Sequence, residues 1–202
     1  MSDCGCEFEI KDKTQARVLK QLLLINAVMF LLELGLGVMA ESTALIADSL
    51  DMLADASVYG IGLYAVGSTL AAKMKAANIS GVLQIILGLL VVVDVLRRFL
   101  SGSEPDSILM MTVGVVALCA NLLCLKLLSR HRDGEVHMRA SWIFSKNDVI
   151  ANIGIVVSGW IVYLTGYSVA DLIIGLIIAL LVVRGGLRIL SEVRSERSGV
   201  EL

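Results

Sequence analysis

Three aspartates at helical spacing interrupt an apolar stretch long enough to cross a bilayer. Their carboxylates could bind a cation. The segment ALIADSLDMLADASVY, residues 44–59, contains Asp48, Asp51 and Asp55. Because residues three and four apart share one face of a helix, the three carboxylates fall within roughly 60° of one another. A carboxylate in mid-membrane costs about 2.5–3.5 kcal/mol even on lenient insertion scales. The stripe therefore predicts an interior cavity filled by water or a cation, and a divalent metal ion is the simplest occupant.

A second polar stripe lies in the apolar stretch 141–164, where four side chains follow the spacing i, i+4, i+7 and i+11: Ser141, Ser145, Asp148 and Asn152. With a helical rise of about 1.5 Å per residue, Asp51, Asp55 and Asp148 each lie on the order of 10–18 Å from a membrane face. We expect these carboxylates to form an oxygen cage for a divalent ion, which Asn147, Asn152 or water would complete. The alternative is that the groups only hydrogen-bond between helices, although Asn or Ser would do so at lower cost.

The composition indicates that membrane-spanning helices position these stripes. The 202 residues are 57% hydrophobic and only 18% charged, with a mean hydropathy of +0.84, whereas soluble domains are about 45–50% apolar and 25% charged. Proline occurs once and glycine eighteen times, which suits long helices in close backbone contact. The net charge of −2 and the lack of a basic patch with interleaved aromatics argue against a nucleic-acid partner. We therefore expect an all-α membrane protein.

Six apolar stretches each approach the roughly 20 residues that a spanning helix needs, and they cover residues 21–40, 43–68, 78–100, 107–128, 141–164 and 168–190. We expect one six-helix transmembrane domain over 21–190, preceded by a polar arm over 1–20 and followed by a short tail over 191–202. Lysines and arginines concentrate in the arm, the second and fourth connections, and the tail, which six spans place on one side. The positive-inside rule then puts both termini in the cytoplasm. The expected location is the bacterial inner membrane.

The first polar stripe resembles a known family signature. The run STALIADSLDMLAD is similar to the second transmembrane helix of the cation diffusion facilitator family. Members of that family carry an acidic residue or histidine, then three residues, then an aspartate at this point. Asp51 and Asp55 match these metal-ligand positions, and Asp48 matches a frequently acidic neighbour. The segment VADLIIGLIIALLVVRGGLRIL also resembles the family's sixth helix, including Asp171, so the similarity extends over residues 17–195.

The fifth span departs from the family pattern, which has a histidine, three residues and an aspartate there. Asp148 matches the aspartate, whereas Phe144 stands at the histidine position and cannot ligate a metal. The loss of a nitrogen ligand leaves an oxygen-rich site and favours harder ions such as manganese or iron, although zinc also accepts carboxylates. Most family members continue into a cytoplasmic metal-binding domain, and these 202 residues contain no counterpart of it.

The resemblance implies a proton-coupled antiporter that expels zinc, cadmium, cobalt, iron or manganese from the cytoplasm, with no permanent cofactor. Asp51 and Asp55 would both be ionised with metal bound, and at least one would be protonated once the metal leaves. Rocking of the second and fifth spans against the rest would expose the site to each side in turn. The expected partners are the metal ion, the lipid bilayer and a second copy of the chain in a homodimer.

Other interpretations of the same residues stay open. An intramembrane aspartyl enzyme needs aspartates on separate helices beside motifs such as a glycine next to the aspartate, which are missing. A helical subunit without transport activity would use its acids only for assembly. In the arm, Cys4 and Cys6 form a Cys-x-Cys pair, which either captures a soft metal or belongs to a disordered arm without a metal role.

Overall fold

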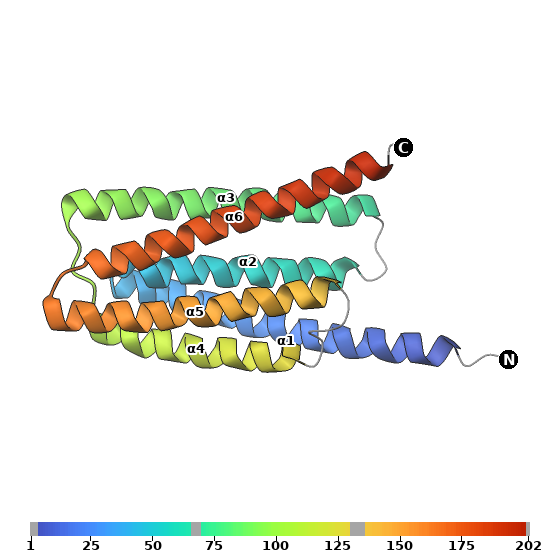
Figure 1. The fold of residues 1–202 in the computed structure, drawn as a ribbon, viewed down its shortest axis with the longest axis horizontal. Coiled ribbons are helices and arrows are strands. Elements are labelled where there is room, and N and C mark those ends of the chain that lie inside the picture. The colour runs from blue at the N-terminus through green and yellow to red at the C-terminus, as the bar shows by residue number, and fades with distance from the viewer. Residues whose placement is uncertain (1–3, 66–69, 130–135, 201–202) are drawn as a thin grey trace.

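The computed structural model describes residues 4–65, 70–129 and 136–200, and over these ranges it contains helices joined by short turns and no strand (Figure 1). The prediction of an all-helical protein is thereby confirmed. The helices are α1 (Cys4–Met39), α2 (Thr43–Ala65), α3 (Leu70–Ser101), α4 (Ser107–Ser129), α5 (Val136–Thr165) and α6 (Val169–Val200).

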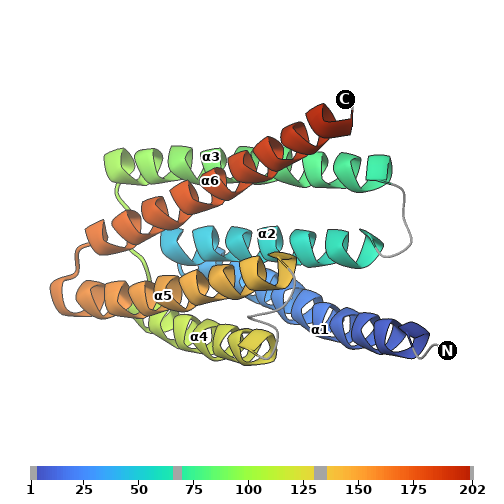
Figure 2. The ribbon, with the colours of Figure 1, turned by 45° about the vertical axis from the view of Figure 1, so that its right-hand side comes forward.

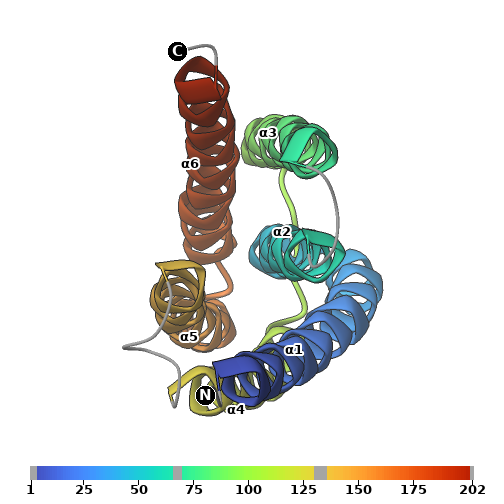
Figure 3. The ribbon, with the colours of Figure 1, turned by 90° about the vertical axis from the view of Figure 1, so that its right-hand side faces the viewer.

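The six helices run along the long axis of the molecule, and successive helices alternate in direction, so that the N- and C-terminal helix ends lie at the same end of the bundle (Figure 1). Figure 2 shows α6 crossing α3 at a slant. Viewed along the bundle, α3 and α6 form one side, α1, α4 and α5 form the other, and α2 lies between them (Figure 3). Helix α2 contacts all five of the others. The helix that carries the three aspartates is therefore central.

Glycines permit the closest approaches between helices. A Cβ atom built on Gly186 of α6 would lie 2.7 Å from the carbonyl oxygen of Gly81 on α3, and one on Gly175 would lie 2.9 Å from the carbonyl carbon of Thr43. Both distances are too short for a real side chain. Small residues at helix crossings are a common way for membrane helices to pack, and here they hold α6 against both α3 and α2.

The first turn of α2 is capped from two directions. The Oγ atom of Ser42 accepts a hydrogen bond of 3.2 Å from the backbone N–H of Leu45, so Ser42 is an N-cap residue. The buried carboxylate of Asp171, at the start of α6, accepts bonds from the Ser42 hydroxyl (2.6 Å) and from the backbone N–H groups of Thr43 (2.7 Å) and Ala44 (3.1 Å). These contacts satisfy N–H groups that have no partner within a helix and fix where α2 begins.

Five helices are long and apolar enough to cross a membrane by length and composition, namely α1, α3, α4, α5 and α6. Their outward surfaces carry large apolar side chains, including Leu31, Phe99 and Leu100. Helix α2 is not among the five, since it contains three aspartates within 23 residues. The prediction of six spans is therefore confirmed for five helices.

Helices α1, α3, α5 and α6 are longer than the predicted apolar stretches, whereas α2 ends at Ala65, before the predicted residue 68. Helix α1 begins at Cys4, inside the predicted arm, and α6 continues to Val200, through most of the predicted tail. Both extensions lie at the end of the bundle that holds the termini (Figure 1). The side chains of Cys4 and Cys6 lie outside the described part of the chain, so their proposed metal capture stays a prediction.

Candidate metal site

The three aspartates of α2 point into the bundle but are not equally enclosed. Asp48 is only 1% exposed, whereas Asp51 and Asp55 are partly buried. The Tyr59 hydroxyl, one turn beyond Asp55, donates a hydrogen bond of 3.1 Å to its Oδ2 atom. Apolar neighbours Ala44, Leu45, Ala47 and Leu50 of the same helix belong to the buried core. The acids thus share α2 with a tightly packed apolar surface.

Asp148 on α5 is brought to the aspartates of α2. Its carboxylate is within hydrogen-bonding reach of both Asp51 and Asp55, which come from a helix almost a hundred residues earlier in the chain. Asp148 itself is buried. The arrangement predicted from the depth of the two stripes, with α2 and α5 facing each other through their acids, is what the structure contains. Whether the group binds a metal stays a prediction.

The two asparagines predicted beside Asp148 lie in different environments. Asn152 is fully buried, and its Nδ2 atom donates a hydrogen bond of 2.9 Å to the backbone oxygen of Asp148. Its Oδ1 atom has no hydrogen-bond partner, and the side chain contacts Asp48. Asn147 is exposed, because consecutive helical residues point about 100° apart. Asn152 therefore belongs with the buried acids, and we leave Asn147 out of the site.

Glu33 of α1 is a further buried acid that was not among the predicted ligands. Its side chain is 0% exposed, it faces Asp48, and neither of its carboxylate oxygens has a hydrogen-bond partner. The sequence feature that could have identified Glu33 is its spacing from Asn26. Seven residues are about two helical turns, so both side chains lie on one face of the helix. Asn26 is also buried. Only the packing of α1 on α2 shows that this face meets the aspartates.

Further polar groups line the same interior towards the end of the bundle that holds the termini. The Nδ2 atom of Asn26 donates to the backbone oxygen of Leu22 at 2.9 Å and lies 3.8 Å from Cys124 Sγ on α4. Asn121, one turn before Cys124, is buried with its Nδ2 atom unpartnered. Four helices, α1, α2, α4 and α5, therefore contribute buried polar atoms to one interior region.

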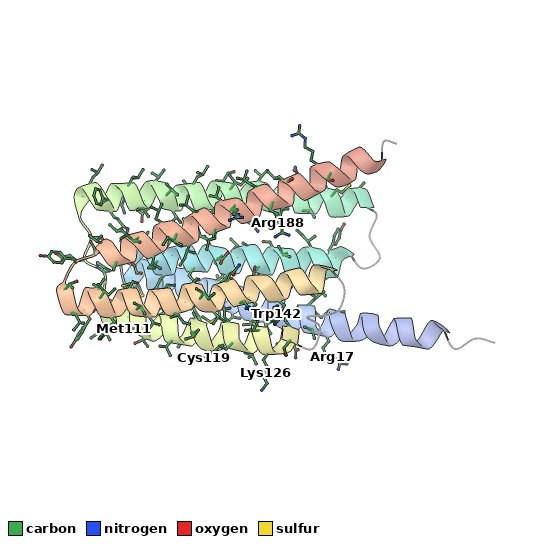
Figure 4. The ribbon with its side chains drawn as sticks, in the orientation of Figure 1. Arg17, Met111, Cys119, Lys126, Trp142 and Arg188 are labelled. Atoms are coloured by element: carbon green, nitrogen blue, oxygen red, sulfur yellow. The ribbon has the colours of Figure 1, made fainter. Side chains whose placement is uncertain are left out.

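The buried aspartates of α2 and α5 are not paired with basic side chains of the described residues. No lysine or arginine in the described ranges forms a salt bridge with Asp48, Asp51, Asp55 or Asp148; Asp94 of α3, by contrast, is paired with Arg97 (2.7 Å) and Arg98 (2.6 Å). Lys146 is exposed, and its ammonium lies 4.8 Å from the centre of the Trp142 ring. Figure 4 shows Trp142, Arg17 and Lys126 in the half of the bundle that holds the termini.

The acids form two groups, one of two residues and one of three. Glu33 faces Asp48, while Asp148 faces Asp51 and Asp55. In the ranges that the structure covers, no three His, Cys, Asp or Glu side chains already converge in a way that could hold a metal ion. An ion bound here would have to draw Asp51, Asp55 and Asp148 closer together, or use the amide of Asn152 and water as further ligands.

The sequence is similar to known proteins over most of its length. A family model described as the cation efflux transmembrane domain matches residues 19–76 and 71–196. The zinc transporter ZitB of Escherichia coli (strain K12) is 26% identical over 181 residues, which are 83% of this chain and 58% of that protein.

Two further relatives show similar levels of identity. The cadmium, cobalt and zinc/H(+)-K(+) antiporter of Bacillus subtilis (strain 168) is 24% identical over 193 residues, which are 86% of this chain and 61% of the relative. The metal cation efflux system protein CzcD of Cupriavidus metallidurans is 25% identical over 181 residues, 81% of this chain and 56% of the relative. The chain thus spans somewhat more than half the length of these relatives.

Proposed function

The chain belongs to the cation efflux transmembrane family, and we propose that it carries a divalent metal cation across the membrane through Asp51, Asp55 and Asp148. The family consists of transporters and not of enzymes, so the intramembrane aspartyl enzyme is set aside. The five apolar helices and the bacterial relatives identify an integral protein of the inner membrane.

One observation carries the proposal: Asp148 on α5 lies next to Asp51 and Asp55 on α2. Within the described residues, no lysine or arginine forms a salt bridge with any of these three aspartates. Carboxylates taken out of water are costly unless a positive charge compensates them. A divalent cation supplies that charge, and carboxylate oxygens are ligands for zinc and manganese alike. In this proposal a doubly charged ion neutralises the three carboxylates, as a lysine or arginine side chain would in another protein.

The substrate is proposed as zinc, cadmium or cobalt, the ions that appear in the names of the relatives. Manganese and iron are added because Phe144 stands where the family has a histidine, so that oxygen ligands dominate the site. Proton coupling is supported by the name of the Bacillus subtilis relative, a cadmium, cobalt and zinc/H(+)-K(+) antiporter. In this proposal one aspartate takes up a proton as the metal leaves, which keeps the buried charge small.

The transport cycle is proposed to alternate access to this site. Helix α2 also crosses the membrane in this scheme, supported by its central position and its contacts with all five other helices. Both termini are cytoplasmic, supported by their position at one end of the bundle, where Arg17 and Lys126 lie (Figure 4). Relative movement of α2 and α5 opens the acids to one side and then to the other. A second copy of the chain completes a homodimer.

The test is zinc uptake into proteoliposomes, with the internal pH recorded at the same time. The wild-type chain is expected to move zinc and protons in opposite directions, and Asp51→Asn is expected to abolish both fluxes. Asp94→Asn is the matched control, because it makes the same change at an aspartate that two arginines already neutralise. Zinc flux no faster than in empty liposomes would contradict the proposal and favour a helical subunit without transport activity.

A further inference from the structure

Glu33 and Asp48 form a buried acidic pair that the proposed transport step does not use. Glu33 comes from α1 and Asp48 from α2, their carboxylates face each other, and both side chains are at most 1% exposed. None of the four carboxylate oxygens has a hydrogen-bond partner. Two acids buried in this way are neutralised either by protons or by a cation held between them.

A third helix contributes an oxygen atom to the pair. Asn152 of α5 is fully buried and contacts Asp48, and its Nδ2 atom is already used by the backbone oxygen of Asp148. The amide Oδ1 atom has no hydrogen-bond partner. Because the amide nitrogen carries a second N–H, one donor remains for an unpartnered amide oxygen and two unpartnered carboxylates, so the acceptors outnumber the donors. Such a set suits a cation that prefers oxygen ligands.

The pair lies beside the acids already proposed as the metal site, and it is displaced along α2. Asp48 precedes Asp51 by three residues, which correspond to about 4.5 Å along a helix. The displacement is towards the turn between α1 and α2, at residues 40–42, opposite the end that holds the termini (Figure 1). An ion leaving Asp51 in that direction would therefore reach Asp48 and Glu33 next.

We propose that Glu33, Asp48 and Asn152 form a second cation position, one helical turn from Asp51 towards the turn between α1 and α2. The inference rests on the proposed transport function and extends it. The ion passes from the position at Asp51, Asp55 and Asp148 to this second position before it leaves the bundle. Glu33 thereby joins the binding residues of the transporter, and Asp48 and Asn152 serve the second position.

The experiment measures binding of Mn²⁺ to the purified full-length chain in detergent by electron paramagnetic resonance. In the variant with Asp51→Asn and Asp55→Asn, the first position is disabled, and we expect residual binding of one ion per chain. Adding Glu33→Gln to this variant should weaken that binding at least about tenfold. Asp48→Asn should do the same, which provides a second variant if Glu33→Gln does not yield a monodisperse protein.

Glu104→Gln, at an exposed glutamate between α3 and α4, is the control and should leave the residual binding unchanged. Absence of residual binding in the Asp51/Asp55 variant would overturn the second position. Residual binding that survives both Glu33→Gln and Asp48→Asn would overturn it as well. Because this experiment measures binding without transport, its outcome is independent of the zinc-flux test of the proposed function.

Discussion

The carboxylate of Asp171 accepts a hydrogen bond of 2.6 Å from the hydroxyl of Ser42, across 129 positions of the chain. Ser42 is the N-cap of α2, and Asp171 lies in the first turn of α6. The same carboxylate accepts the backbone N–H groups of Thr43 and Ala44. A negative charge at the N-terminus of a helix is favourable because of the helix dipole. The start of the helix that carries Asp48, Asp51 and Asp55 is therefore held by α6.

Removing the charge of Asp171 should loosen α2. Asp171→Asn replaces one accepting oxygen by a donor that faces backbone N–H groups, and the loss of a buried charge-assisted hydrogen bond costs about 1–3 kcal/mol. We expect a lower melting temperature in detergent, with Ser42→Ala giving a smaller decrease. The two substitutions should not be additive, since each removes the same contact. An Asp171→Asn protein that melts at the wild-type temperature would show that the hydrogen bonds of Asp171 to the start of α2 do not stabilise the protein.

The close contact between α6 and α2 should tolerate no added side chain at Gly175. A Cβ atom there would lie 2.9 Å from Thr43 atoms and 3.0 Å from the backbone nitrogen of Ala44. Gly175→Ala should therefore destabilise the protein by about 1–3 kcal/mol through overpacking. Gly35→Ala is the matched control, because nothing lies within 4 Å of the corresponding Cβ position. Equal melting temperatures for the two variants would contradict this packing.

The residue at position 144 should influence which metal is preferred. Phe144 precedes Asp148 by four residues, and such residues share a helix face. Phe144→His would add an imidazole ligand, which zinc accepts more readily than manganese does. We expect the ratio of zinc to manganese transport to rise at least about tenfold. Phe144→Leu controls for the loss of the aromatic ring, and an unchanged ratio in Phe144→His would place position 144 away from the ion.

Much of this site is predictable from the sequence because it depends on local periodicity and on membrane depth. Spacing within α2 places Asp48, Asp51 and Asp55 on one face, and counting residues from the membrane faces brings Asp148 to the same depth. The six predicted spans are confirmed only for five helices, because the three aspartates keep α2, predicted as a span over 43–68, out of the helices that qualify by length and composition.

The remaining features depend on contacts between helices. Glu33 meets Asp48 because α1 packs along α2, and no spacing within α1 specifies that neighbour. Asn147 was predicted as a ligand on its proximity to Asp148 in sequence, but a helix turns it outward. The capping of α2 by Asp171 likewise joins residues that only the folded bundle brings together.

Asp51 and Asp148 are proposed to share one divalent ion, and a double-mutant cycle of zinc binding tests this sharing most directly. Zinc affinity would be measured calorimetrically for the wild type, Asp51→Asn, Asp148→Asn and the double variant. If both carboxylates ligate the same ion, the second substitution should cost much less than the first, with a coupling energy of at least about 1 kcal/mol. Losses of affinity that simply add, or single variants that bind zinc as the wild type does, would contradict a shared ion.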